Sequence, residues 1–286
     1  MTESYCNDPR CPRVRKGESH PIHDLSKVEE ERNEDLRRFL ELGSELAGGS
    51  IGAAAGLAVA GPQGAIVGSI LGTSIGFTLK QAGLDLLKRI LSLRESKRAA
   101  AVLIHASNKI DSYRKMGHSL RGDDFFNNTI TERSAADEIA EGVILAAQRE
   151  HEEKKLTYFG NLLANIAFSS GISRAHGDAL IKISKGLTYR QLCLLSIFGQ
   201  NDKFTLRPTP YTDNLTLPIQ LVSILHEILQ LEKDALISSG NVVLALSDIN
   251  PGKFKLEGEG QIIFKLMNLT ELPTDDLAPV ADALAK

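Results

Sequence analysis

The sequence is poor in the residues on which small secreted domains depend. It has no tryptophan and only three cysteines among 286 residues. So few cysteines exclude a disulfide-based scaffold and indicate a reducing compartment. The formal net charge is −3, so the chain as a whole is not drawn to nucleic acid or to anionic lipid. Residues 1–26 are polar and hold no apolar run, so we expect a disordered tail there rather than a secretory signal.

The common enzyme motifs are missing as well. The sequence has neither a G-x-x-x-x-G-K-[ST] phosphate loop nor a G-x-S-x-G nucleophile elbow. Asp123 and Asp124 have no histidine or lysine partner at a recognisable spacing, so we interpret the acidic residues that follow them as helix caps and solubilising groups. We therefore predict a protein that is not an enzyme and that carries no cofactor.

Four possible zinc ligands lie in the polar tail: Cys6, Cys11, His20 and His23. Thiolates and imidazoles are the ligand types that zinc prefers. Their C-x4-C-x8-H-x2-H spacing differs from that of the common zinc fingers, whose cysteine and histidine pairs have other separations. The spacing therefore favours chance composition, and we predict no metal site.

The most distinctive feature is residues 46–79, which contain no charged side chain between Glu45 and Lys80. A small residue recurs there at every fourth position, namely Gly48, Gly52, Gly56, Ala60, Gly64, Gly68, Gly72 and Gly76. On a helix this spacing forms one nearly continuous stripe. Glycine inside a helix costs roughly 1 kcal/mol relative to alanine, so such a stripe predicts the close approach of another helix. We interpret the segment as a glycine zipper that contacts lipid or further copies of the chain.

Gly61 and Pro62 divide this segment near its middle and predict a hairpin turn. Each arm has about 16 residues and would be roughly 24 Å long, less than the hydrocarbon core of about 30 Å. Basic residues flank both ends (Arg32, Arg37 and Arg38 before, Lys80, Lys88, Arg89, Arg94, Lys97 and Arg98 after). This charge pattern places both ends on the cytoplasmic side. A re-entrant hairpin fits best; one long kinked helix and a hairpin buried in a soluble bundle are the alternatives.

The rest of the chain has apolar residues at helical spacing. Shorter helices are predicted over residues 28–45, 176–187 and 189–198, and one helix or two over residues 81–116. A long helix is expected to begin at the capping residue Ser134 and to run to about Ser169, with the mixed-charge run REHEEKK (149–155) on its solvated face. Cys193 lies among apolar residues and is expected to be a buried, inert thiol.

Residues 188–286 resemble a winged-helix domain in the order of their elements. The helix over 189–198 is followed by a second helix over 218–238. Strands over 242–246 and 253–256, joined by a turn at 250–252, come next, and a last helix covers 262–267. The runs 229–237 (LQLEKDALI) and 256–267 (LEGEGQIIFKLM) carry the likeness. The presumed recognition helix carries Glu227, Glu232 and Asp234 against Lys233. DNA binding needs basic residues there, so we predict packing or protein contact instead.

The runs EHEEKKLTYFGNLLANIA (150–167) and LTYRQLCLL (187–195), together with this C-terminal pattern, resemble bacterial proteins of the abortive-infection alpha type. Those proteins share a helical body and a winged-helix-like end, and some have a glycine-rich segment near the front. The resemblance implies a role in phage defence or toxicity at the membrane.

Together these features predict a mainly α fold: a glycine-zipper hairpin with a long-helix bundle, then a small α+β winged-helix-like domain. The expected divisions are a tail (1–26), N-terminal helices with the hairpin (27–117), a helical domain (118–187) and the winged-helix-like domain (188–286). The expected function is that of a membrane-associated effector whose hairpin inserts or oligomerises, at the cytoplasmic face of the inner membrane or cytoplasmic before insertion. Expected partners are membrane lipid, further copies of the chain and a protein bound by the C-terminal domain, with nucleic acid unexpected. The alternative is a soluble interaction or regulatory protein with the hairpin buried.

Overall fold

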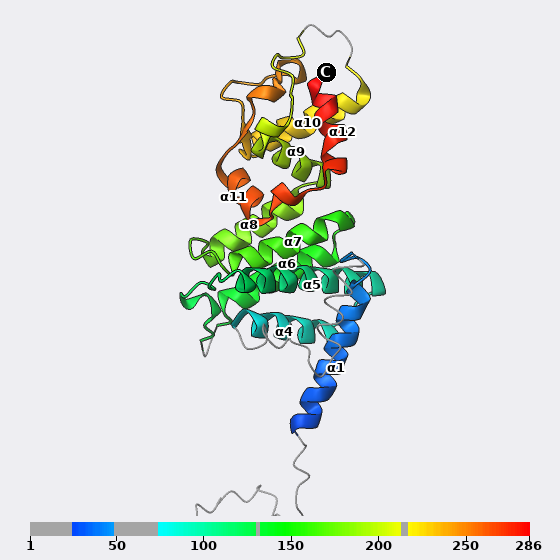
Figure 1. The fold of residues 1–286 in the computed structure, drawn as a ribbon, viewed down its shortest axis with the longest axis vertical. Coiled ribbons are helices and arrows are strands. Elements are labelled where there is room, and N and C mark those ends of the chain that lie inside the picture. Colours follow the sequence, from blue (N-terminus) through cyan, green and yellow to red (C-terminus); the bar gives the residue numbers. More distant parts are fainter. Residues whose placement is uncertain (1–24, 49–73, 130–131, 213–216) are drawn as a thin grey trace, which may run out of the picture.

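The computed structural model describes residues 25–48, 74–129, 132–212 and 217–286. These residues are mainly helical, with a small two-stranded sheet, so the predicted mainly α fold class is confirmed. They form an elongated molecule in which two groups of helices are stacked (Figure 1). The first group, which we call the helical body, contains α1 (Leu25–Gly43), α4 (Ser74–Leu87), α5 (Leu93–Lys115), α6 (Ala135–Gln148) and α7 (Leu156–Ile166).

The second group, the C-terminal unit, is joined to the helical body through α8 (Arg174–Gly186). It contains α9 (Tyr189–Gly199), α10 (Ile219–Lys233), β1 (Ile237–Ser238), β2 (Lys255–Leu256), α11 (Gly258–Leu266) and α12 (Thr274–Ala285). The two strands pair antiparallel, with Ile237 opposite Leu256. Short 3-10 helices cover Asp124–Phe126, Glu153–Lys155, Asn201–Lys203, Leu246–Asp248, Pro251–Lys253 and Leu269–Glu271.

Helix α5 is the centre of the helical body and contacts α1, α4, α6 and α7. Its middle, from Ala99 to Ala106, is buried on nearly all sides. The predicted boundary at 117/118 falls between α5 and α6, two helices that pack directly on each other. On the opposite side from the C-terminal unit, α4 forms the outer layer of the body (Figure 1).

Local capping explains where several helices begin. The Ser134 side chain accepts a hydrogen bond from the Asp137 N–H at 3.0 Å, so the predicted start of α6 is confirmed. Ser92 and Glu95 form a reciprocal capping box that starts α5 and separates it from α4. The stretch 81–116 is therefore two helices with a corner between them.

The predicted long helix from Ser134 to Ser169 is wrong. Helix α6 ends at Gln148, and a turn with a 3-10 segment precedes α7 at Leu156. The turn is held by Lys155, whose Nζ donates to Glu150 Oε2 at 2.5 Å, while Glu150 Oε1 accepts from the Glu152 N–H at 2.9 Å. The REHEEKK run is therefore not a solvated helix face, because the side chains of Glu150 and Lys155 are only 6% and 2% exposed.

The C-terminal unit departs from the prediction in its strands and its last helix. Helix α10 ends at Lys233 rather than 238, because Ala235 adopts a left-handed conformation (φ 54°) that turns the chain into β1. Residues 242–246 form no strand; the partner of β2 is β1. Helix α11 already begins at Gly258, and α12, which contains Pro279, was not predicted. Proline inside a segment argues against a helix on sequence grounds alone.

His105 is buried between α5 and α7, where its Nε2 lies 3.2 Å from Thr157 Oγ1. Burial lowers the pKa of His105 to about 4. The unfolded chain binds this proton near pH 6.5, so His105 makes the folded state progressively less stable as the pH falls from about 6.5 to about 4. We expect His105→Gln to remove about 2 kcal/mol of the stability lost between pH 7.5 and pH 5, as measured by urea unfolding at both pH values. An equal loss in variant and wild type would contradict this assignment.

Candidate functional site

Most of the predicted zipper lies outside the described residues. This applies to Gly52, Gly56, Gly64, Gly68 and Gly72, to the turn residues Gly61 and Pro62, and to the cysteines and histidines of the tail. Gly48 and Gly76 are described: Gly48 has a φ of 82°, which favours glycine, and Gly76 is buried in α4. The glycine zipper and its hairpin stay predictions.

The two described ends that flank residues 49–73 are both fixed to the helical body. At the first end, Lys97 Nζ donates to Glu45 Oε2 at 2.6 Å, and this hydrogen bond lowers the pKa of Glu45. Just before it, Gly43 lies against Ala100, leaving no space for a side chain. At the second end α4 begins at Ser74, and its residues Ile75 and Leu79 are buried. The body therefore holds both flanks of the segment.

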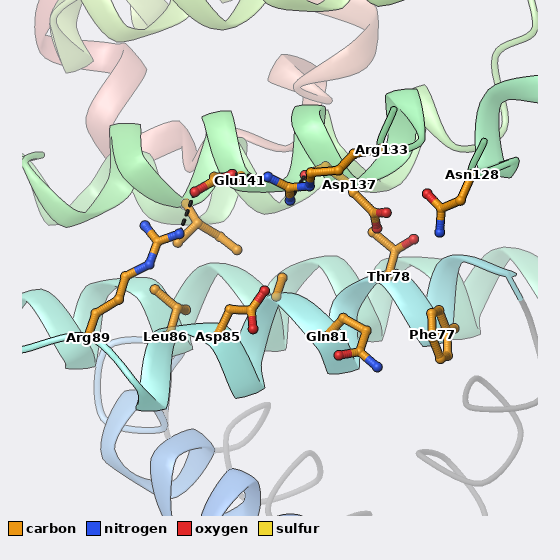
Figure 2. Close-up of a pocket in the computed structure, with 12 residues that line it drawn as sticks. Phe77, Thr78, Gln81, Asp85, Leu86, Arg89, Asn128, Arg133, Asp137 and Glu141 are labelled. Atoms are coloured by element: carbon orange, nitrogen blue, oxygen red, sulfur yellow. Dashed lines mark hydrogen bonds and ion pairs between the residues drawn. The ribbon is translucent and has the colours of Figure 1, made fainter. Parts of the chain in front are cut away.

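Helix α4 is attached to α6 across a cleft of about 260 Å³ (Figure 2). Figure 2 shows side chains of α4 facing those of α6 and of the loop before it. The lining residues are Phe77, Thr78, Gln81, Ala82, Asp85, Leu86, Arg89, Asn128, Arg133, Asp137, Glu141 and Ile144.

Glu141 is the centre of an ionic contact that closes one side of this cleft. Arg89, two residues after the end of α4, donates to its Oε1, and Arg133 donates to its Oε2 at 2.5 Å. Both hydrogen bonds lower the pKa of Glu141, and the same contact raises the pKa of Arg133. Glu141 is thus an ionised, doubly paired carboxylate rather than a poised base. The described lining includes no histidine, cysteine or serine, so the cleft fastens α4 to α6 and offers no nucleophile of those kinds.

The polar side chains of the 150–167 run join the helical body to the C-terminal unit. Asn161 Nδ2 donates to the Met267 carbonyl at 3.1 Å, and Asn165 Nδ2 donates to the Leu266 carbonyl at 2.7 Å. Glu152 accepts from the Tyr189 N–H at 3.0 Å. Sequence reasoning missed this role, although two asparagines within the otherwise apolar stretch of α7 were a usable signal. The residues that carry the family resemblance therefore have structural contacts here.

A group of potential metal ligands is formed by Glu150, His151 and Glu152, whose ligand atoms lie within 4.8 Å of one another. Lys155 already pairs with Glu150, and the Tyr189 N–H already occupies Glu152. We assign no metal to this group. Cys193 is buried, which confirms that prediction, and burial raises the pKa of its thiol to about 12. It is therefore a protonated, unreactive thiol at neutral pH.

Among the described helices, none combines the length and the apolar character that crossing a bilayer requires. Comparison with protein-family models, with curated proteins and with solved structures finds no match to this chain.

Proposed function

We propose that this is a non-enzymatic, membrane-associated protein in which a glycine-zipper hairpin within residues 46–79 inserts into the bilayer or oligomerises there. The resemblance to abortive-infection alpha-type proteins implies a phage-defence or toxin-type effector, which we place at the cytoplasmic face of the inner membrane. The observation that carries the proposal is that both flanks are anchored in one helical body. Glu45 is bound by Lys97 of α5, and α4 packs on α6. The segment between them is uncharged, and its two ends cannot leave the body without breaking these contacts.

The anchoring also limits how deep a hairpin can reach. Ile75 and Leu79 are buried in the body and Glu45 is paired with Lys97, so we assign the proposed hairpin to residues 49–73. Arms of roughly 12 residues would be about 18 Å long as helices, against a hydrocarbon core of about 30 Å. A single hairpin of this length is re-entrant and does not cross the bilayer. Disturbing the bilayer would therefore require several copies, whose glycine stripes permit close packing.

The test is fractionation of the full-length chain with a carbonate wash. We expect wild type to leave a carbonate-resistant membrane pool, and Gly56→Leu with Gly68→Leu to reduce that pool at least fivefold, because leucine blocks the close approach of helices. Gly122→Leu with Gly171→Leu is the matched control, since both glycines have open space around them. The control is expected to match wild type, and all three chains should keep the same helical circular dichroism.

A second chain separates the segment from its flanks. It replaces residues 49–73 with a Gly/Ser linker and so leaves the buried Ile75 and Leu79 of α4 in place. We expect it to lose the carbonate-resistant pool entirely. If the wild-type pool is absent, or if it is unchanged by the Gly56 and Gly68 substitutions, the proposed function is wrong.

The alternative, a soluble interaction protein with a winged-helix-like end over 188–286, is supported by a different observation. Ile219, Val242 and Leu244 are largely exposed on the C-terminal unit. Ile219 begins α10, which contacts the 3-10 helix that follows Leu244. Exposed apolar residues at such a place suit contact with a partner protein. A wild-type chain that stays wholly in the soluble fraction would favour this alternative.

A further inference from the structure

The connection between α4 and α5 carries the most exposed large apolar side chains of the helical body. We call residues 86–94 the α4–α5 corner. Ile90 is fully exposed there, Leu93 is 63% exposed, and Leu87 is also open to solvent. Single exposed apolar residues are ordinary on a protein surface, but several that lie close together in the chain mark a contact surface.

The corner is held rigidly, so this exposure is built into the fold. The capping box of Ser92 and Glu95 fixes its second half, with the Ser92 N–H donating to Glu95 Oε2 at 2.9 Å. Arg94 pairs with Glu153, and Arg89 pairs with Glu141. These contacts tie the corner to α6 and to the turn before α7.

The segment that contains the corner is basic in sequence, and its cations pair with acidic side chains outside it: Lys88 with Asp85, Arg89 with Glu141, Lys97 with Glu45, and both Arg94 and Arg98 with Glu153. Residues 86–98 contain five basic side chains (Lys88, Arg89, Arg94, Lys97 and Arg98) and one acidic side chain (Glu95). The acidic side chain is engaged in the cap of α5. The Lys88 and Arg94 side chains, which flank Ile90, are 71% and 56% exposed. The whole chain, in contrast, has a net charge of −3.

A groove of about 340 Å³ lies beside the corner, between it and α1. Its lining is apolar along Phe39, Leu42, Leu86, Leu87 and Leu91, with Arg38, Arg89, Asp35 and Ser96 as the polar members. Arg38 and Arg89 pair with Glu34 and Glu141, so the apolar lining is what this groove offers to an acyl chain.

We propose that the α4–α5 corner and this groove bind the surface of an anionic bilayer. Ile90 and Leu93 enter the boundary between head groups and acyl chains, while Lys88 and Arg94 face the lipid phosphates. This peripheral contact deepens the proposed function, because it brings the first flank of residues 49–73, held by the Lys97–Glu45 pair, toward the membrane. It does not depend on insertion of that segment, since the corner belongs to the fixed helical body.

The experiment is flotation of the full chain with vesicles of phosphatidylcholine alone or with about one third phosphatidylserine, followed by a wash in 1 M salt. The chain with Gly56→Leu and Gly68→Leu is used as the parent, because its corner is intact while its predicted zipper is blocked. We expect it to float with the anionic vesicles only and to be released by the salt wash. Adding Ile90→Glu and Leu93→Glu should lower binding at least tenfold, and adding Lys88→Gln and Arg94→Gln at least threefold.

Met116→Glu in the same parent is the matched control, because Met116 is also apolar and 61% exposed but lies at the other end of α5. It should bind as its parent does. Equal binding by the Ile90/Leu93 variant, equal binding to neutral vesicles, or no binding by the parent would each overturn the proposal. A wild-type chain without a carbonate-resistant pool would refute insertion alone, because the salt-released pool is measured separately.

Discussion

Replacement of Lys155 by methionine is expected to lower the free energy of unfolding by about 3–5 kcal/mol. Lys155 neutralises Glu150 inside the turn between α6 and α7, and both side chains are almost completely buried. Without the ammonium group, Glu150 becomes an unpaired charge in a site of low polarity. The turn also loses the contact between Lys155 and Glu150 that closes it. The Glu150 carboxylate holds the turn through both Lys155 and the Glu152 N–H. Urea unfolding monitored by circular dichroism measures the loss.

The double variant Glu150→Leu/Lys155→Met is the control for this mechanism. Replacing both partners removes the uncompensated charge, and buried pairs replaced in this way are often near neutral in stability. We expect it to recover most of the loss caused by Lys155→Met. Lys88→Met, which breaks the exposed pair with Asp85, should cost less than about 1 kcal/mol. A double variant as unstable as the single one would show that the turn needs the carboxylate itself.

This buried pair also shows where sequence reasoning stopped. The run REHEEKK alternates charge as a solvated helix does, and the apolar residues on either side continue the helical spacing. The helix is interrupted where Glu150 and Lys155, two residues five positions apart, contact each other and are buried in the folded chain. Periodicity detects which face is apolar, but it does not detect that a charged residue will find a buried partner.

Helix starts were easier to predict than strands. Ser134 lies three residues before Asp137, and that local pattern is enough to predict the start of α6. The strand β1 has two residues, and its existence depends on the left-handed turn at Ala235 and on pairing with Lys255 and Leu256. Such pairing is set by contacts distant in sequence, which a short apolar run does not reveal.

In the candidate site too, some features can be predicted from residue spacing and others cannot. The glycine stripe and its basic flanks can be read directly from spacing and composition. The exposure of Ile90 and Leu93 could not be predicted from the sequence, because a Leu-Ile-Leu pattern also fits one continuous amphipathic helix. The signal that was available is the capping box of Ser92 and Glu95, which starts a new helix and leaves Ile90 outside both.

Close helix packing by small residues is visible within the described body, and it yields the second large effect. Gly160 of α7 faces α5 so closely that a Cβ would lie 2.4 Å from the His105 Cβ and 3.0 Å from the Ala106 nitrogen. A helix is ordinarily less stable with glycine at an interior position than with alanine there, by about 1 kcal/mol. At Gly160 we expect the opposite sign: Gly160→Ala should destabilise by about 3 kcal/mol, because two packed helices must move apart.

Gly186→Ala in α8 is the matched control, since that glycine is also helical but has open space around it. It should be neutral or stabilise the chain by up to about 1 kcal/mol. The opposite signs of the two substitutions, measured in one urea-unfolding series, separate close approach from helix propensity. A stabilising Gly160→Ala would mean that α5 and α7 are farther apart than the structure places them. A destabilising result shows that this chain uses glycine for tight helix contact in its core, which is the packing that the predicted zipper would require in the bilayer.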